Sequence, residues 1–299
     1  MRIDERLAAG APCFSFEFFP PCTDEGERNL GRALAELSRL DPAFVSVTYG
    51  AGGTTDQKLK TLDIVTHAKA EYGLEAMAHF TCVGATVEEL RATLDRMRAA
   101  GIENVLALRG DPPAGQDEWT ATEGGLSYSR ELIEMIRADY DFAIGAACFP
   151  EVHVHAESAE SDLRYLKEKV DAGARFLITQ LFFDNASYYD FVARAREIGV
   201  EVPIVPGIMP ITNYGQICRI TEMCGSVIPA HLVAELDVRA DDPHAVTDFG
   251  VAYATLQCAD LLAKGAPGIH FYTLNRSPAT RAILSALRAM APWRGAVPA

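Results

Sequence analysis

Short apolar runs alternate with longer amphipathic segments along the whole chain, and this alternation restricts the possible folds more than any other feature of the sequence. The runs that favour buried strands are Cys13 to Phe19, Phe44 to Tyr49, Glu75 to Cys82, Val105 to Arg109, Ala143 to Cys148, Phe176 to Gln180, Val202 to Pro206 and Ile269 to Leu274. The segments with helical periodicity are roughly Asp24 to Leu40, Gln57 to Tyr72, Val87 to Ala100, Ser129 to Ala138, Ser158 to Ala172, Ser187 to Ile198, Tyr214 to Met223 and Pro243 to Lys264. About eight strands, each followed by a helix, predict an α/β fold of the (β/α)8 TIM barrel type.

The clearest helix begins after Thr86, which has capping-box spacing to Glu89. Apolar residues recur on one face of this helix, at Val87, Leu90, Leu94 and Met97. Gly101 ends it, and the apolar run around Val105 follows at once. A short run that is apolar at every position is typical of a strand buried on both faces, as in a parallel sheet.

A doubly wound sheet is the rival fold, but it usually carries a glycine-rich phosphate turn after its first strand. Here the first strand ends in Glu17-Phe18-Phe19-Pro20-Pro21, without that turn. No linker, low-complexity tract or composition shift divides the chain. We therefore expect a single catalytic barrel domain over residues 1–299.

The charge and the cysteines limit the partners of the protein. A formal net charge of -14 repels nucleic acid and anionic membranes at long range. The seven cysteines are scattered and form no C-x-x-C pair, which suits a reducing compartment. Neither a signal peptide nor a membrane-spanning run is apparent. We expect a cytoplasmic protein without nucleic-acid or membrane partners.

In a barrel of this type, chemistry is located where the strands end. The polar residues expected there are Glu17, Thr48, His79, Arg109, Gly110, Asp111, Glu151, His153, His155, Gln180 and Arg276. Taken singly, Thr48, His79 and Gln180 are equally well explained as hydrogen-bonded core residues. Together they predict a site at this end of the barrel.

Glu17 lies between Phe16 and Phe18 in an apolar strand, where a carboxyl group must be paired, solvated or neutral. One interpretation is a structural ion pair. The favoured one is a general acid whose pKa is raised by apolar walls. The Arg109-Gly110-Asp111 segment is either a strand-end turn with a salt bridge or a ligand clamp in which Gly110 permits close approach.

Glu151, His153 and His155 alternate, so they share one face of an extended segment. No other cysteine or carboxylate obviously completes a metal site, and we expect no metal there but a ligand contact by His153. Lys169 and Asp162 lie on one helix face, an arrangement that alone is usually solvated. Four aromatic residues are expected mostly in the core, with one of the last two at a ligand site: Phe18, Phe19, Phe182 and Phe183.

Five segments in this order resemble methylenetetrahydrofolate reductases of the bacterial type. They are Phe14 to Pro21, Phe44 to Gly50, Ala107 to Pro112, Pro150 to His153 and Phe271 to Arg276. The resemblance runs from about Phe14 to Arg276, and the combination is highly specific although each motif alone is weak. It covers the catalytic barrel only, and we expect no counterpart of the S-adenosylmethionine-binding regulatory domain of eukaryotic relatives.

The resemblance implies FAD bound at the mouth of the barrel. The implied FAD contacts are Thr48, His79, Arg109, Gly110, Asp111, Tyr128, Ser129, Phe149, His153, Ala156, Asp162 and Lys169. Folate contacts are implied at Gln180, Gln216 and Arg276. Glu17 is implied as the general acid, also in contact with the substrate, and Asp111 as a catalytic neighbour of flavin and pterin.

The implied activity is the reduction of 5,10-methylenetetrahydrofolate to 5-methyltetrahydrofolate with NAD(P)H as hydride donor, in a ping-pong scheme that feeds methionine synthesis. A homo-oligomer is also implied. Three positions depart from the family pattern: Phe149 replaces an expected tyrosine, His155 an expected acidic residue, and Ile220 an aromatic residue of some relatives. Two alternatives stay open: an FAD-dependent barrel dehydrogenase of the proline dehydrogenase kind, and a folate-binding barrel that has lost NADH oxidation.

Overall fold

A parallel sheet curls into a barrel in the computed structural model, which describes residues 1–49, 55–110 and 122–295. Its strands are β1 (Cys13–Phe18), β2 (Phe44–Val47), β3 (Ala76–Thr81), β4 (Asn104–Leu108), β5 (Ala143–Cys148), β6 (Phe176–Thr179), β7 (Ile204–Val205), β8 (Gly207–Ile208) and β9 (Gly268–Tyr272). They are ordered β7-β6-β5-β4-β3-β2-β1-β9-β8. The predicted TIM barrel is confirmed.

The seventh strand of the barrel is broken. The strand predicted from Val202 to Pro206 is present as β7, which pairs with β6, but the prediction missed β8, which follows Pro206 and pairs with β9. Proline has no backbone N–H to give to a ladder. Its carbonyl still accepts a hydrogen bond from the backbone N–H of His270 at 2.9 Å, so the chain itself closes the barrel at this point.

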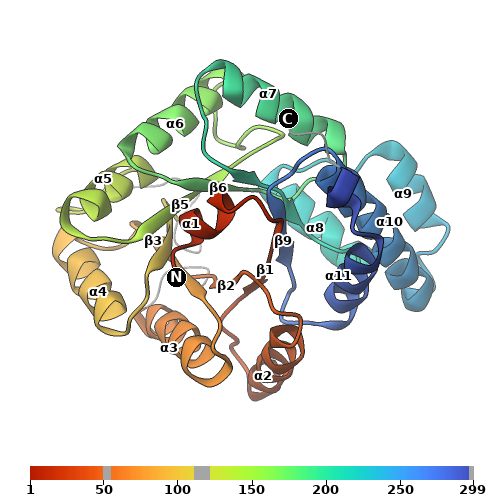
Figure 1. Ribbon diagram of the computed structural model, residues 1–299, viewed down its shortest axis with the longest axis horizontal. Helices are drawn as coiled ribbons and strands as arrows, with labels where there is room; N and C mark the ends of the chain where they lie inside the picture. The colour runs from red at the N-terminus through yellow and green to blue at the C-terminus, as the bar shows by residue number, and fades with distance from the viewer. Residues whose placement is uncertain (50–54, 111–121, 296–299) are drawn as a thin grey trace.

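Helices form a ring around the strands (Figure 1). The longer helices are α2 (Asp24–Ser38), α3 (Thr55–Tyr72), α4 (Val87–Ala99), α5 (Ser129–Asp139), α6 (Ala159–Ala172), α7 (Asn185–Glu197), α8 (Tyr214–Cys224), α10 (Pro243–Ala263) and α11 (Pro278–Met290). The eight predicted helices are confirmed, with bounds that differ by at most two residues. Helix α11 was not predicted, although Pro278 at its start and the apolar spacing of Ile283, Leu284 and Leu287 signal it.

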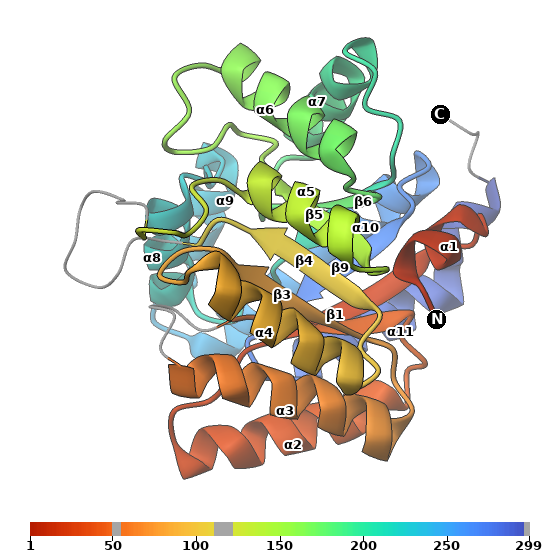
Figure 2. The ribbon, with the colours of Figure 1, turned by 90° about the vertical axis from the view of Figure 1, so that its left-hand side faces the viewer.

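Two short helices and a terminal turn were also missed: α1 (Ile3–Ala8), α9 (Ala230–Asp237) and the 3-10 turn η1 (Pro292–Gly295). Helix α1 lies at the end of the barrel where the strands begin, and the arrow of β4 points away from it (Figure 2). Its Ile3 and Leu7 side chains are buried in an apolar cluster with Phe44 and Met77. The end of the barrel that carries α1 is therefore filled with apolar side chains.

Three of the four phenylalanines expected in the core are buried, and the fourth lies beyond the end of a strand. Phe18, Phe182 and Phe183 are buried, whereas Phe19 is 39% exposed, so the expectation that it belongs to the core is wrong. Phe19 follows the last residue of β1, where the sheet no longer covers it.

Among the described helices, none combines the length and the apolar character that a membrane span requires.

The capping box predicted for α4 is present. The Thr86 hydroxyl accepts a hydrogen bond from the Glu89 N–H at 3.3 Å, and the Glu89 carboxylate accepts one from the Thr86 N–H at 2.9 Å. We expect Thr86→Ala to lower the free energy of unfolding by about 1 kcal/mol, because the Glu89 N–H loses the hydroxyl that accepts its hydrogen bond. Urea unfolding measures this, with Glu88→Gln as the control in the same helical turn. Equal effects of the two substitutions would contradict the prediction.

Candidate active site

Side chains of four strands converge on Glu17 inside the barrel. Successive residues of a strand point to opposite faces, so Phe16 and Phe18 face the helices while Ser15 and Glu17 face the interior. The interior is apolar near α1 and polar toward the other end. The polar side chains that meet there are Ser15 and Glu17 of β1, Ser46 of β2, His79 of β3 and His270 of β9.

The contacts of Glu17 all fall on one carboxyl oxygen, Oε2. The Nε2 atoms of His270 and His79 each lie 3.2 Å from it, and the Ser46 hydroxyl donates to it at 3.5 Å. The His270 contact has hydrogen-bond geometry, whereas that of His79 is an electrostatic contact only. No described residue donates a hydrogen bond to Oε1. The contacts among the described residues therefore hold Oε2, and Oε1 receives no hydrogen bond from them.

Burial alone would raise the pKa of Glu17, but the opposing effect of His79 and His270 lowers the pKa of this carboxyl group to about 2. The predicted raised pKa is therefore wrong, and the contacts with the two histidines favour the interpretation of Glu17 as a paired carboxyl group. The error arose because Phe16 and Phe18, the neighbours in sequence, face away, whereas the histidines come from distant strands. The role of Glu17 as an acid stays a prediction.

This ionised carboxyl group makes stability depend on pH. Its folded pKa of about 2 lies below the ordinary 4.5, so ionised Glu17 stabilises the fold above pH 4.5. That contribution is lost as the pH falls from about 4.5 toward 2. We expect the stability difference between the wild type and Glu17→Gln to shrink in the same window, measured by denaturant unfolding from pH 6 downward. A pH-independent difference would contradict the lowered pKa.

Asn275 fixes the end of β1 beside this cluster. Its amide group accepts from the Phe19 N–H at 3.0 Å and donates to the Phe19 carbonyl at 2.8 Å. The Thr273 hydroxyl donates to the carbonyl of Glu17 at 2.6 Å. The segment after β9 therefore positions the backbone that carries Glu17.

A second cluster lies at the end of β5. The rings of Phe149 and His153 are perpendicular with centroids 4.5 Å apart, and the His153 N–H donates to Asp162 at 3.2 Å. Lys169 donates to the carbonyl of Ala147 at 2.6 Å. Burial raises the pKa of Asp162 and lowers the pKa of Lys169. These two residues of α6 face β5, so the solvated-face interpretation is wrong.

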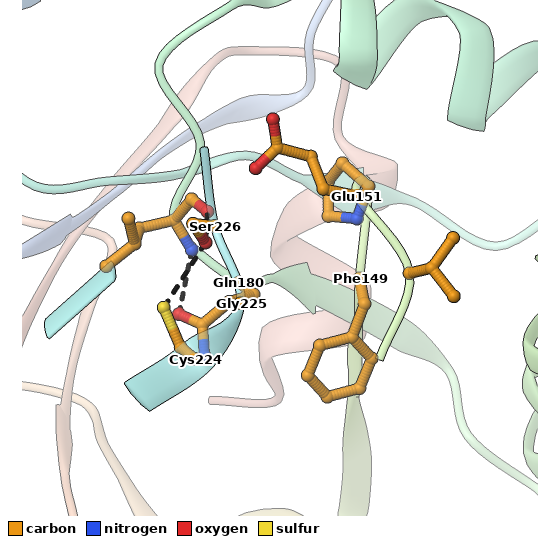
Figure 3. A pocket seen from close by; sticks show the side chains of 9 residues that line it. Phe149, Glu151, Gln180, Cys224, Gly225 and Ser226 are labelled. Carbon is orange, nitrogen blue, oxygen red and sulfur yellow. Dashed lines mark hydrogen bonds between the residues drawn. The ribbon is translucent and has the colours of Figure 1, made fainter. Parts of the chain in front are cut away.

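A pocket adjoins this cluster, and Figure 3 shows Phe149, Gln180 and Cys224 around it. The Gln180 amide oxygen accepts from the Leu181 N–H at 2.8 Å, and no described residue accepts from its amide nitrogen. Glu151 accepts from the Val227 N–H at 2.9 Å and from the Ser187 hydroxyl at 3.4 Å. Glu151 thus ties the loop after α8 to the barrel, while Gln180 presents a donor to the pocket.

The alternating residues after β5 do not converge on one point. His153 accepts a hydrogen bond at Nδ1 from the His155 N–H at 3.0 Å, while Glu151 binds the loops described above. Within residues 1–49, 55–110 and 122–295, no three His, Cys, Asp or Glu side chains are grouped as metal ligands. Phe149 keeps an aromatic ring beside His153 and Lys169.

The remaining predicted residues are distributed around the same end of the barrel. Thr48 follows β2, Arg109 and Gly110 follow β4, Tyr128 and Ser129 begin α5, Ala156 precedes α6, Gln216 lies in the first turn of α8, and Arg276 follows β9. Asp111, like Gly50, lies outside the described residues. Gly110 has φ +94°, and a Cβ atom there would lie 2.3 Å from the Val83 side chain. Its glycine is required by the chain turn itself.

Arg276 lines a separate cavity of about 180 Å³ together with Thr212, Thr247, Tyr272 and Pro278. The cavity is bounded by the segments after β8 and β9 and by α10. The exposed guanidinium group gives this cavity a positive charge. An anionic group is the ligand that such a cavity favours.

Ser15, Ser46 and His270 are site residues that were not predicted from the sequence, and all three are fully buried. A signal was present, because each is a polar residue inside an apolar strand. Ser15 is two positions from Glu17 and therefore on the same face. The distance of 253 positions between Glu17 and His270 concealed their contact.

Comparison with known proteins gives concordant matches. Residues 2–288 match the family model described as methylenetetrahydrofolate reductase. The chain is 41% identical over 304 residues to methylenetetrahydrofolate reductase (NADH) 1 of Arabidopsis thaliana, covering 95% of this chain and 51% of the relative. It is 40% identical over 273 residues to 5,10-methylenetetrahydrofolate reductase of Escherichia coli K12, covering 91% and 90%. The chain thus spans about half the length of its plant relatives.

Solved structures share the fold at low identity. A Clostridium thermocellum protein that binds two copies of 5-methyl-5,6,7,8-tetrahydrofolic acid is 15% identical, with a TM-score of 0.63 and coverage of 96% of this chain and 98% of that one. Dihydropteroate synthase of Xanthomonas albilineans, in complex with 7,8-dihydropteroate, is 15% identical, with a TM-score of 0.51 and coverage of 94% and 93%. These likenesses support the barrel alone.

Proposed function

Because this chain belongs to the methylenetetrahydrofolate reductase family of oxidoreductases, we propose that it reduces 5,10-methylenetetrahydrofolate to 5-methyltetrahydrofolate with a reduced nicotinamide nucleotide as hydride donor. The observation that carries the proposal is the Glu17 carboxyl group, fixed through Oε2 inside the barrel while Oε1 has no described partner. The plant relatives are named as NADH enzymes, which favours NADH over NADPH.

The residues at the mouth of the barrel suit FAD. The partly buried ammonium group of Lys169 has a pKa lowered by burial, so an anionic diphosphate beside it would offset the cost of its charge. The Phe149 ring lies 5.9 Å from that ammonium group. Other proposed contacts are Thr48, His79, Arg109, Gly110, Tyr128, Ser129, His153, Ala156 and Asp162. When bound, FAD would carry the hydride between nucleotide and folate, while the protein orients both.

The folate substrate requires a proton. Its five-membered ring opens when the departing nitrogen is protonated, and Glu17 is the proposed donor. Since the two histidines outweigh the effect of burial and keep Glu17 ionised, its carboxyl group must gain a proton as the substrate binds. Gln180 would donate its amide N–H to the pterin edge, and Arg276 would pair with the anionic tail. Gln216 is a further proposed folate contact, and Asp111 would stabilise the positive charge of the opened ring.

The family resemblance also implies a cellular location, an oligomeric state and a metabolic role for the protein. We propose a cytoplasmic homo-oligomer that supplies methyl groups for methionine synthesis, with two substrates that take turns at the same site. Membership in the family disfavours the proline dehydrogenase alternative. Bleaching of the flavin by NADH distinguishes the reductase from a folate-binding barrel that has lost NADH oxidation.

The first test is a visible spectrum of the purified protein with FAD, in which a bound flavin absorbs at about 450 nm. Without oxygen, NADH should remove this absorbance and methylenetetrahydrofolate should restore it. A yellow protein that NADH does not bleach would point to NADPH or a partner reductant, with Ile220 the first residue to exchange. A protein that binds folate but never flavin would overturn the redox proposal.

A further inference from the structure

A buried hydrogen-bonded series connects Ser15 and Glu17 of β1 with His270 of β9. The Ser15 hydroxyl lies 2.8 Å from Nδ1 of His270, and Nε2 of His270 lies 3.2 Å from Oε2 of Glu17. The exposed fractions of Ser15 and His270 are 0%. The His270 ring stacks on Phe44 with centroids 5.9 Å apart and an angle of 18°. Neither side chain reaches solvent, so neither can contact a folate directly.

The protonation of the His270 ring follows from its partners. An ionised carboxylate only accepts hydrogen bonds, so Nε2 must carry a hydrogen. In the neutral ring Nδ1 is then an acceptor, and the Ser15 hydroxyl donates to it. The Glu17 carboxylate therefore selects the tautomer with an N–H on Nε2, and Ser15 stabilises this tautomer by donating to Nδ1. A hydrogen bond at the second ring nitrogen is the usual way in which a protein fixes the role of a histidine.

The same geometry decides which oxygen of neutral Glu17 carries the proton. Both His270 Nε2 and the Ser46 hydroxyl approach Oε2 as donors. A proton on Oε2 would face these donors, whereas a proton on Oε1 leaves Oε2 as the acceptor that they require. The acid proton consequently belongs on Oε1, the oxygen without a described partner.

We propose that His270, oriented by Ser15, is a positioning residue that holds Oε2 of Glu17 and directs the acid proton to Oε1, toward the folate. This inference rests on the proposed function. In the step it serves, the Oε1–H bond breaks as the N–H bond at the departing folate nitrogen forms, and the carboxylate retains the electron pair. His270 keeps its own proton throughout and stabilises that carboxylate through Oε2.

Other groups face Glu17 from each neighbouring strand. His79 approaches from β3 and Ser46 from β2, while Tyr272 of β9 donates its hydroxyl to the carbonyl of Thr179. Burial and the nearby Glu17 raise the pKa of Tyr272, so it stays neutral. Removing His270 leaves these groups in place and takes away one donor. The pKa of Glu17 should therefore rise in its absence.

The test compares His270→Phe, which keeps a ring on Phe44 but removes both nitrogens, with His270→Gln, which retains a donor and an acceptor. We expect His270→Phe to slow folate reduction about 10- to 100-fold on the acid plateau of the pH profile, with the Kd for folate unchanged. The alkaline limb should move up by about one pH unit, and the rate of reaction with NADH should not change. His270→Gln should restore most of the rate, and Ser15→Ala should give a smaller shift in the same direction.

A second readout does not depend on turnover. The infrared C=O band of protonated Glu17, identified by its loss in Glu17→Gln, should appear at higher pH in flavin-free His270→Phe than in the wild type. A wild-type rate and pH profile in His270→Phe, equal losses in both half-reactions, or an unmoved infrared titration would overturn the inference. If the phenylalanine variant does not fold, His270→Gln and Ser15→Ala decide through the same profiles. If the wild-type protein fails to reduce folate, the proposed function is wrong. The infrared titration still tests whether His270 lowers the pKa of Glu17.

Discussion

Glu17→Gln should lower the rate of methylenetetrahydrofolate reduction by about 10²- to 10⁴-fold, the usual contribution of a general acid, while the reaction with NADH stays near the wild-type rate. Glutamine can accept the hydrogen bonds that His270 and Ser46 donate to Oε2, so the barrel interior should keep its shape. It has no acid proton for the departing folate nitrogen. The loss should therefore be confined to the folate half-reaction, measured in a stopped-flow spectrometer after separate mixing with NADH and with folate.

Glu75→Gln is the matched control for this experiment. Glu75 is another partly buried carboxylate that pairs with a cation, Lys69 at 3.1 Å, but it precedes β3 at the opposite end of the barrel. Its replacement should leave both half-reactions intact. Near-normal folate turnover by Glu17→Gln would refute the assigned acid. Equal losses in both half-reactions would indicate a damaged flavin site instead.

Gly250→Ala should lower the free energy of unfolding by about 3 kcal/mol or more, a large effect for a single added methyl group. A Cβ atom at Gly250 would lie 1.8 Å from the carbonyl oxygen of Ile211 and 2.7 Å from its carbonyl carbon. Backbone atoms cannot rotate away as a side chain can, so α10 would have to move off the segment after β8. Thr247 of α10 and Thr212 of that segment both line the Arg276 cavity. We therefore expect folate affinity to fall as well.

Gly31→Ala supplies the contrast, because Gly31 lies in α2 and a Cβ atom added to it would meet no atom of the described residues within 4 Å beyond its own stretch of helix. In open space the intrinsic preference of helices for alanine decides, and stability should rise by about 0.5–1 kcal/mol. Guanidinium unfolding of the two variants tests both signs together. If Gly250→Ala lowered the free energy of unfolding by only about as much as Gly31→Ala raises it, about 0.5–1 kcal/mol, α10 would have moved away from Ile211 at little cost.

The sequence predicted the parts of this protein that depend on neighbours along the chain. Periodicity located the strands and most helices, and the Thr86 capping box could be recognised over four residues. The barrel followed from the alternation, because parallel strands joined by helices have few other solutions. The break at Pro206 was harder to predict, since a proline at a strand end and one inside a barrel wall look alike in sequence.

The electrostatics of the candidate site depended on pairing across the barrel, and there the sequence was insufficient. Glu17 could be identified as an unusual carboxyl group, but its histidine neighbours come from β3 and β9. The direction of its pKa shift was therefore wrong, and the roles of Ser15 and His270 were missed. Lys169 and Asp162 are a similar case, because only the packing of α6 against β5 reveals that they face inward.

The interrupted seventh strand has a thermodynamic consequence. Where Pro206 breaks the ladder, side chains bridge the gap: the Thr179 hydroxyl accepts from the Gly207 N–H at 2.9 Å, and the Tyr272 hydroxyl donates to the Thr179 carbonyl at 2.6 Å. Local opening of a protein concentrates where backbone pairing is sparse. Gln180 lies on one side of this seam and Arg276 on the other. A folate that contacts both residues would hold the two sides of this gap together. By linkage, the population in which β7 and β8 separate should then fall as the folate concentration rises.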